Sequence, residues 1–176
     1  TQEWAVRYFN PGNGADNAKA IVLDAVGNIY VTGESYSSES NYDFATVKYN
    51  SAGDQQWAAR YNGPGNYIDN AVSIAVDDSG NVIVSGYSTG INTDYDFTTI
   101  KYSPSGVQLW VQRYSSSADF GDQVKSMAID AAGNIYITGT SYETGEASNF
   151  TTIKYNSAGT KIWQQNYNGP GNNTDI

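Results

Sequence analysis

The sequence contains no cysteine, no histidine and one methionine, Met127. Thiol chemistry, thiolate metal sites and imidazole bases are therefore excluded from these residues. Disulfides are excluded as well, so the fold must depend on a packed core. No stretch approaches 18 consecutive apolar residues, so we expect no transmembrane helix. Only nine of the 176 residues are Lys or Arg against 18 Asp or Glu, and the net charge of −9 disfavours nucleic acid or an anionic membrane as partner.

Aromatic residues are abundant instead, at 14% of the chain with 15 Tyr, which indicates a folded protein. All four Trp residues are spaced 53 residues apart, and many other positions follow the same spacing without insertion or deletion. A period of this length predicts a solenoid or a propeller. The recurring aromatic positions are Trp4, Trp57, Trp110 and Trp163, then Tyr8, Tyr61, Tyr114 and Tyr167, then Phe44, Phe97 and Phe150.

Each repeat is predicted to form four short strands. In the middle repeat these cover residues 71–77, 81–88, 96–103 and 107–115, separated by a Gly-containing turn, a polar loop and the turn "PSG". No window shows a useful helical period. Four antiparallel strands per repeat, without helices, predict an all-β fold: a β-propeller built from 53-residue four-stranded antiparallel blades.

The phase of the repeat predicts three complete blades and one extra outer strand. Residues 1–17 would hold the outer strand of a preceding blade and its crossover loop, and residues 169–176 a crossover toward a further blade. The complete blades would cover residues 18–62, 71–115 and 124–168. Because propellers usually need four or more blades, we expect the partners to be further blades of the same polypeptide or copies of the chain itself.

Three motifs recur with the period: Trp followed by Tyr four residues later and Asp eight residues after that Tyr, then D-x-x-G-N, then F-x-T-x-K-Y. In this combination the chain resembles the bacterial seven-bladed β-propeller (SBBP-type) repeat family over essentially its whole length. The resemblance implies a propeller fold and an extracellular or cell-surface bacterial protein, whose export signal would lie upstream of Thr1. It implies almost no biochemistry, because propellers support many functions.

Pairing Asn50 with Gln55 in a hairpin would place Phe44 opposite Tyr61 and Lys48 opposite Trp57. We therefore interpret the recurring aromatic residues as the structural core of the blades. A sugar-stacking platform, of the kind that lectins use, is the alternative.

Six of the nine cations also follow the repeat, and regular cations should meet regular anions. We predict one ion pair or charge-assisted hydrogen bond per blade interface; a catalytic Lys is the alternative. The aspartates of the D-x-x-G-N motif are also expected to accept N–H groups of their own turns, since the motif lacks the downstream Glu of an EF-hand. The residues assigned to these pairs are Lys48, Lys101, Lys154, Arg7, Arg60, Arg113, Asp24, Asp77 and Asp130.

A further recurring aspartate precedes the first strand of each blade, at Asp16, Asp69, Asp122 and Asp175. In a propeller this junction approaches the central channel, so the four could form a ring of carboxylates at one mouth. Such a ring could hold Ca²⁺, because hard cations favour carboxylate oxygens. The alternative is that each aspartate bonds to amides of its own loop, in which case no cofactor is needed.

The loops between second and third strands, residues 35–43, 88–96 and 141–149, vary most between repeats. Variable loops on a rigid scaffold are the usual place for binding sites. We therefore expect a non-catalytic structural or interaction module, acting as a scaffold, in protein or glycan binding, or in self-assembly. The alternative is the propeller portion of a secreted glycan hydrolase or lyase, which the lack of His and of a carboxylate pair outside the repeat disfavours.

Overall fold

The computed structural model describes residues 4–8, 14–118, 120–144 and 148–169, which form twelve β-strands and no helix. None of them belongs to a helix long and apolar enough to cross a membrane. The strands are β1 (Asp16–Leu23), β2 (Ile29–Ser37), β3 (Asn41–Tyr49), β4 (Gln55–Tyr61), β5 (Asp69–Val76), β6 (Val82–Thr89), β7 (Tyr95–Tyr102), β8 (Gln108–Tyr114), β9 (Gln123–Ile129), β10 (Ile135–Tyr142), β11 (Ser148–Tyr155) and β12 (Lys161–Tyr167).

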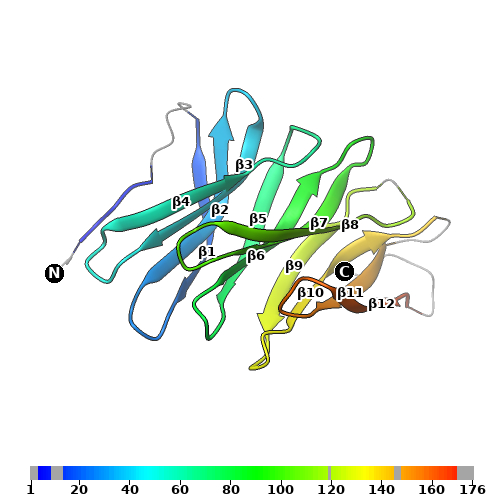
Figure 1. The fold of residues 1–176 in the computed structure, drawn as a ribbon. Helices are drawn as coiled ribbons and strands as arrows, with labels where there is room; N and C mark the ends of the chain where they lie inside the picture. The colour runs from blue at the N-terminus through cyan, green and yellow to red at the C-terminus, as the bar shows by residue number, and fades with distance from the viewer. Residues whose placement is uncertain (1–3, 9–13, 119, 145–147, 170–176) are drawn as a thin grey trace.

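The strands form three antiparallel four-stranded sheets, in the orders β1-β2-β3-β4, β5-β6-β7-β8 and β9-β10-β11-β12. We call these sheets blade 1, blade 2 and blade 3. Figure 1 shows them side by side, with the β1–β2, β5–β6 and β9–β10 hairpins at one end of the strands and the β2–β3, β6–β7 and crossover loops at the other. The all-β propeller-blade architecture predicted from the repeat is thus confirmed.

The first hairpin of each blade is shaped by its D-x-x-G-N motif. In blade 2, Oδ1 of Asp77 accepts the N–H groups of Ser79 and Asn81, at 3.0 and 2.9 Å. Gly80 follows with a φ of 75°, a left-handed conformation that a side chain would strain. The local sequence therefore closes the turn without help from the rest of the fold.

The predicted register of the outer hairpin in blade 1 is confirmed along most of its length. Phe44 pairs with Tyr61 and Lys48 with Trp57. Beyond Lys48 the ladder shifts by one residue, so that Gln55 pairs with Tyr49 and not with Asn50. The shift is a β-bulge, which places an unpaired residue in one strand and bends it.

The core lies between the sheets. One cluster joins blades 1 and 2, with Tyr30 and Phe44 of blade 1 against Val84 and Ile100 of blade 2. A second cluster repeats the arrangement between blades 2 and 3. Each blade therefore has two different faces: one presents aromatic residues to the following blade, and the other presents branched aliphatic residues and a Tyr to the preceding blade.

The extra outer strand expected near the start of the chain is not formed over residues 4–8, none of which pairs in a ladder. An outer strand bonds only to the third strand of its own blade, and the described residues contain no further strand of that blade. Trp4 nevertheless packs on Gly53, just as Trp57 packs on Gly106 one repeat later. The segment occupies part of the place of an outer strand without its hydrogen bonds.

Candidate functional site

The recurring Trp residues join consecutive blades. The ring of Trp57 lies against Gly106 in the outer hairpin of blade 2, and its indole N–H donates to the carbonyl of Pro104 at 3.0 Å. Trp110 repeats both contacts, on Gly159 and on the carbonyl of Ser157 at 3.4 Å. A hairpin glycine is needed here because a Cβ would enter the indole ring.

The recurring Phe and Tyr residues form edge-to-face pairs on the same face of each blade. Phe44 and Tyr61 have ring centroids 5.8 Å apart, and Phe97 and Tyr114 have centroids 5.7 Å apart. Both Phe side chains are buried against the following blade. In blades 1 and 2 these rings are therefore used in packing and are not available to stack on a ligand.

The aspartates of the first hairpins meet the recurring lysines in two ways. In blade 1 the hydroxyl of Tyr30 donates to Asp24 at 3.0 Å, and the ammonium of Lys48 lies 5.2 Å from the centre of the Tyr30 ring. Blade 3 repeats this with Asp130, Tyr136 and Lys154. A tyrosine thus separates the two charges, and the predicted direct ion pair is absent from both blades.

Blade 2 has Ile83 where the other blades have this tyrosine, and there the direct pair forms. Nζ of Lys101 lies 2.9 Å from Oδ2 of Asp77, and both side chains are largely buried. Although burial opposes ionisation of Asp77, hydrogen bonds from Asn81 and the nearby Lys101 together lower its pKa. Lys101 also donates to the carbonyl of Ser157 in blade 3 at 3.2 Å.

The structure corrects the partners predicted for the arginines. Arg60 pairs with Asp43 at 2.7 Å and Arg113 with Asp96 at 2.7 Å, within one blade in each case and not across an interface. The reason is geometric: Arg60 and Arg113 are on the outer strand, opposite the start of the third strand, while the D-x-x-G-N hairpins lie at the far end of the sheet. Arg7 forms no ion pair with a carboxylate among the described residues.

These Arg–Asp pairs are built into larger networks. Arg113 also donates to Oγ and to the carbonyl of Ser88, at 2.7 and 2.9 Å, and to the hydroxyl of Tyr61 in blade 1 at 3.3 Å. In blade 3 the equivalent positions hold Asn166 and Asn149, 53 residues after Arg113 and Asp96. In blade 3 two amide side chains therefore replace both members of the Arg–Asp ion pair. This joint replacement can be read from the sequence.

The aspartates that precede the first strands contact the crossover loops. Oδ2 of Asp69 accepts the N–H of Gly63 in the "YNGPGN" loop at 2.6 Å. Asp122 accepts the N–H and the hydroxyl of Ser116, each at 2.7 Å, and the N–H of Tyr142 at 3.2 Å. Burial raises the pKa of Asp69, and that of Asp122 to about 6. Each carboxylate thus bonds its own loop.

The hypothesis of a cation ring stays a prediction. Asp16 lies in β1, and Asp175 falls outside the described residues. Within the described ranges, no three acidic side chains are grouped closely enough to hold a metal ion.

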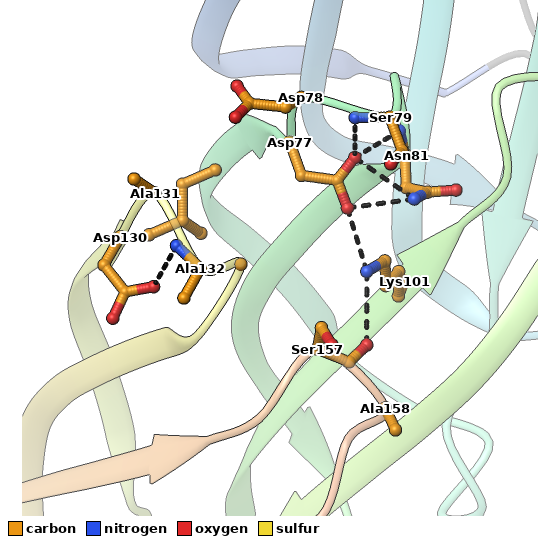
Figure 2. Close-up of a pocket in the computed structure, with 12 residues that line it drawn as sticks. Asp77, Asp78, Ser79, Asn81, Lys101, Asp130, Ala131, Ala132, Ser157 and Ala158 are labelled. Atoms are coloured by element: carbon orange, nitrogen blue, oxygen red, sulfur yellow. Dashed lines mark hydrogen bonds and ion pairs between the residues drawn. The ribbon is translucent and has the colours of Figure 1, made fainter.

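Two cavities lie between the first hairpins of neighbouring blades. One, of about 410 Å³, is lined by Asp77, Asp130, Lys101 and Ser157 among others. Figure 2 shows Asp77 bound to Lys101 and to its own turn, and Asp130 bound to its own turn. The other, of about 430 Å³, lies between the blade 1 and blade 2 hairpins near Asp24 and Val26. The charged groups that line both cavities, apart from Asp78, take part in the contacts described above.

The opposite end of the strands carries the variable loops and the crossovers. The two kinds of loop are bonded together: the N–H of Gly65 donates to the carbonyl of Thr89, and the side chain of Asn66 to the carbonyl of Glu39. Tyr67 and Phe120, which are equivalent positions one repeat apart, are both exposed here. Phe120 lies edge to face with Tyr142, with centroids 5.8 Å apart. We call this end the loop face.

Comparison with known proteins agrees with the repeat and the sheets. Residues 6–39 and 109–145 match a family model described as a beta-propeller repeat, and residues 27–55 match a beta-propeller domain of unknown function. Parts of this chain are therefore similar to beta-propeller repeat proteins, in agreement with the three sheets. This propeller chain is also 33% identical, over 116 residues, to an uncharacterized WD repeat-containing protein of Acanthamoeba polyphaga mimivirus. That alignment covers 53% of the chain but only 8% of the viral protein.

Proposed function

We propose that this beta-propeller repeat domain is a non-catalytic interaction module of an extracellular or cell-surface bacterial protein. The proposal rests on one observation: the repeated polar residues have structural roles. Lys101, Arg60, Arg113 and Asp122 are each engaged in contacts that hold a turn, a loop or a blade in place. An active site would need catalytic groups left free of such structural roles.

The loop face is the binding surface in this proposal. Tyr67 and Phe120 are exposed on it, and the polar groups of Ser117 and Glu143 lie in the same loops. Exposed aromatic rings with polar neighbours suit the apolar face of a sugar ring or the side chains of a protein partner. The similarity to a WD repeat-containing protein supports an interaction role.

The test compares binding with turnover. The chain is applied to immobilised glycans, and release of reducing ends is assayed from the glycans that it binds. Binding without release is expected, and the double substitution Tyr67→Ala with Phe120→Ala should weaken it by about tenfold or more. Val26→Ala is the control, because Val26 is also an exposed apolar residue but lies at the opposite end of the strands. Turnover that a single carboxylate substitution abolishes would establish the alternative, a glycan hydrolase or lyase.

A further inference from the structure

Blade 2 differs from both other blades at several positions, and three of these lie at or next to one cavity. Its first hairpin reads D-D-S-G-N, whereas the equivalent hairpins read D-A-V-G-N in blade 1 and D-A-A-G-N in blade 3. The two polar residues, Asp78 and Ser79, line the cavity of about 410 Å³ between blades 2 and 3. The third difference is Ile83, which stands where the other blades have a tyrosine and pairs across the strands with Lys101, another residue of the lining. The three differences give this cavity a chemistry that the repeat alone does not provide.

The missing tyrosine changes how far the cavity extends. In blade 1 the phenol of Tyr30 separates the hairpin aspartate from Lys48, and the cavity beside it is lined only by the first strands and first hairpins of blades 1 and 2. Ile83 leaves no phenol at this place in blade 2, and the cavity there reaches Lys101 and, in the outer hairpin of blade 3, Ser157. Blades 2 and 3 enclose this cavity between them, so a further repeat at either end of the chain would not cover it.

The floor of the cavity offers a hydrogen-bond donor. Lys101 is only 5% exposed, and its ammonium lies between Oδ2 of Asp77 and the carbonyl of Ser157, at 2.9 and 3.2 Å (Figure 2). A protonated lysine has three N–H groups, so one is left beyond these two contacts. A ligand that reaches the floor therefore needs a hydrogen-bond acceptor there.

The rim of the cavity offers a carboxylate. The lining holds three carboxylates against one ammonium, so it attracts cations and repels anions. Asp77 and Asp130 accept N–H groups of their own turns, but the exposed Asp78 forms no ion pair within the described ranges. Between floor and rim the wall is apolar. Its members are Ile129, Ala131, Ala132 and Ala158.

We propose that this cavity binds a small hydroxylated amine, such as an amino sugar. A ligand hydroxyl accepts the remaining N–H of Lys101, the ligand ammonium pairs with Asp78, and the ligand C–H groups contact the apolar wall. The volume of about 410 Å³ lies in the usual range for small-ligand pockets, about 300–1,000 Å³. The site is at the end of the strands opposite the loop face, so it goes beyond the function proposed above.

The test titrates the chain with three probes of similar size and different charge: glucosamine, glucose and gluconate. Binding is followed in amide NMR spectra, where signals of residues 78–80 and 131–133 should shift. Glucosamine should bind about fivefold more tightly than glucose, the difference expected from one exposed ion pair, and gluconate should not bind measurably. High salt should reduce the preference for glucosamine, because it screens that ion pair.

Two substitutions separate the contributions of rim and floor. Asp78→Ala restores the alanine of the other two hairpins and should abolish the preference for glucosamine over glucose. Asp94→Ala is the matched control, because it removes an exposed carboxylate at the loop face and should change nothing. Ile83→Tyr restores the tyrosine of blades 1 and 3 and should abolish binding of all three probes, because the phenol would separate Asp77 from Lys101. This variant should fold, since both other blades carry the tyrosine.

Three outcomes would overturn the inference: equal affinities for gluconate and glucosamine, glucosamine binding that Ile83→Tyr leaves unchanged, or no shift at the highest soluble concentration of glucosamine. Glycan binding by the loop face should survive Ile83→Tyr, whereas glucosamine binding in the cavity should survive the double substitution of Tyr67 and Phe120. The two proposals can therefore fail independently.

Discussion

The carboxyl group of Asp122 is almost completely buried under the crossover loop that leads into blade 3. Three hydrogen bonds from Ser116 and Tyr142 favour its ionised form, but burial outweighs them and raises its pKa from the ordinary 3.8 to about 6. The carboxyl therefore gains a proton within a pH range in which the same group in the unfolded chain is ionised. At the scale of single residues, this carboxyl group makes the stability of the fold depend on pH.

We predict that Asp122→Asn reduces the dependence of stability on pH. Between about pH 4 and pH 6 the native state retains a proton that the unfolded state has lost, so the free energy of unfolding decreases as the pH rises. The substitution should remove a change on the order of 2 kcal/mol across this range. Urea unfolding at a series of pH values measures it. Asp130→Asn is the control, because hydrogen bonds from Asn134 lower the pKa of Asp130 and its contribution is lost as the pH falls below this range.

A second prediction concerns the pair of Arg113 and Asp96. Asp96→Asn alone leaves a half-buried guanidinium without its counter-ion and should destabilise the protein by about 2–4 kcal/mol. Adding Arg113→Asn recreates the two amides that blade 3 has at Asn149 and Asn166, and should recover part of the loss. A double-mutant cycle from urea unfolding measures the coupling. Simple additivity of the two single substitutions would show that the residues are not a unit.

At the scale of elements, the repeated contact is between a Trp of one blade and the outer hairpin of the next. It holds at three places in the described chain, Trp4 on Gly53, Trp57 on Gly106 and Trp110 on Gly159. The glycine is required twice over, by its positive φ and by the indole ring where its side chain would be. The hairpin is therefore specified by the neighbouring blade as well as by its own turn.

This contact predicts unequal effects for two glycine substitutions. In Gly133→Ala the new Cβ meets only Ser157 at 3.4 Å, so the cost is the positive φ of 75°, about 1 kcal/mol. In Gly106→Ala the φ is similar, but the Cβ would lie 2.7 Å from the ring of Trp57. We expect a further loss of about 1–3 kcal/mol, visible in the melting temperature and in Trp fluorescence. Equal losses for the two variants would mean that the indole moves aside freely.

The strands and most of their register could be predicted from the sequence. The 53-residue period allows each turn to be compared with the equivalent turns of the other two repeats, which fixes where the strands begin and end. Phe44 opposite Tyr61 follows from the hairpin alone. The bulge after Lys48, which recurs after Lys101 and Lys154, was not predicted, because the pairing was continued in strict alternation up to the turn. The Arg–Asp pairs were missed because Asp43 and Asp96 become Asn in the third repeat and so leave the strict pattern. The joint change of Arg113 to Asn166 and of Asp96 to Asn149 was the available signal.

At the scale of the whole molecule, the three blades differ in how much of each is covered. Blade 2 has neighbours on both faces, and its strands β6 and β7 contain the most completely buried residues, among them Val82, Val84 and Ile100. Blade 3 leaves its aromatic face open, and blade 1 leaves Ile21 and its neighbours on β1 open. Since each blade contacts only adjacent blades, stability should decrease from the centre toward both ends.

Hydrogen exchange should show this gradient. We predict that amides of β6 and β7 exchange most slowly and that those of β1 and β12 exchange faster, because local opening at an end exposes less buried surface. Mass spectrometry of exchanged peptides, at a concentration where the chain is monomeric, measures it. Uniform protection across the three blades would contradict the prediction.

The junction contacts have a consequence for how such a chain can lengthen in evolution. Trp57 reaches residues 47 and 49 positions further on, and Trp110 does the same with its own neighbour. A tandem duplication of any 53 consecutive residues keeps every one of these offsets, wherever in the repeat it begins. The gene can therefore gain or lose a blade starting from any position in the repeat, while a duplication whose length is not a multiple of the repeat would break every junction that spans it.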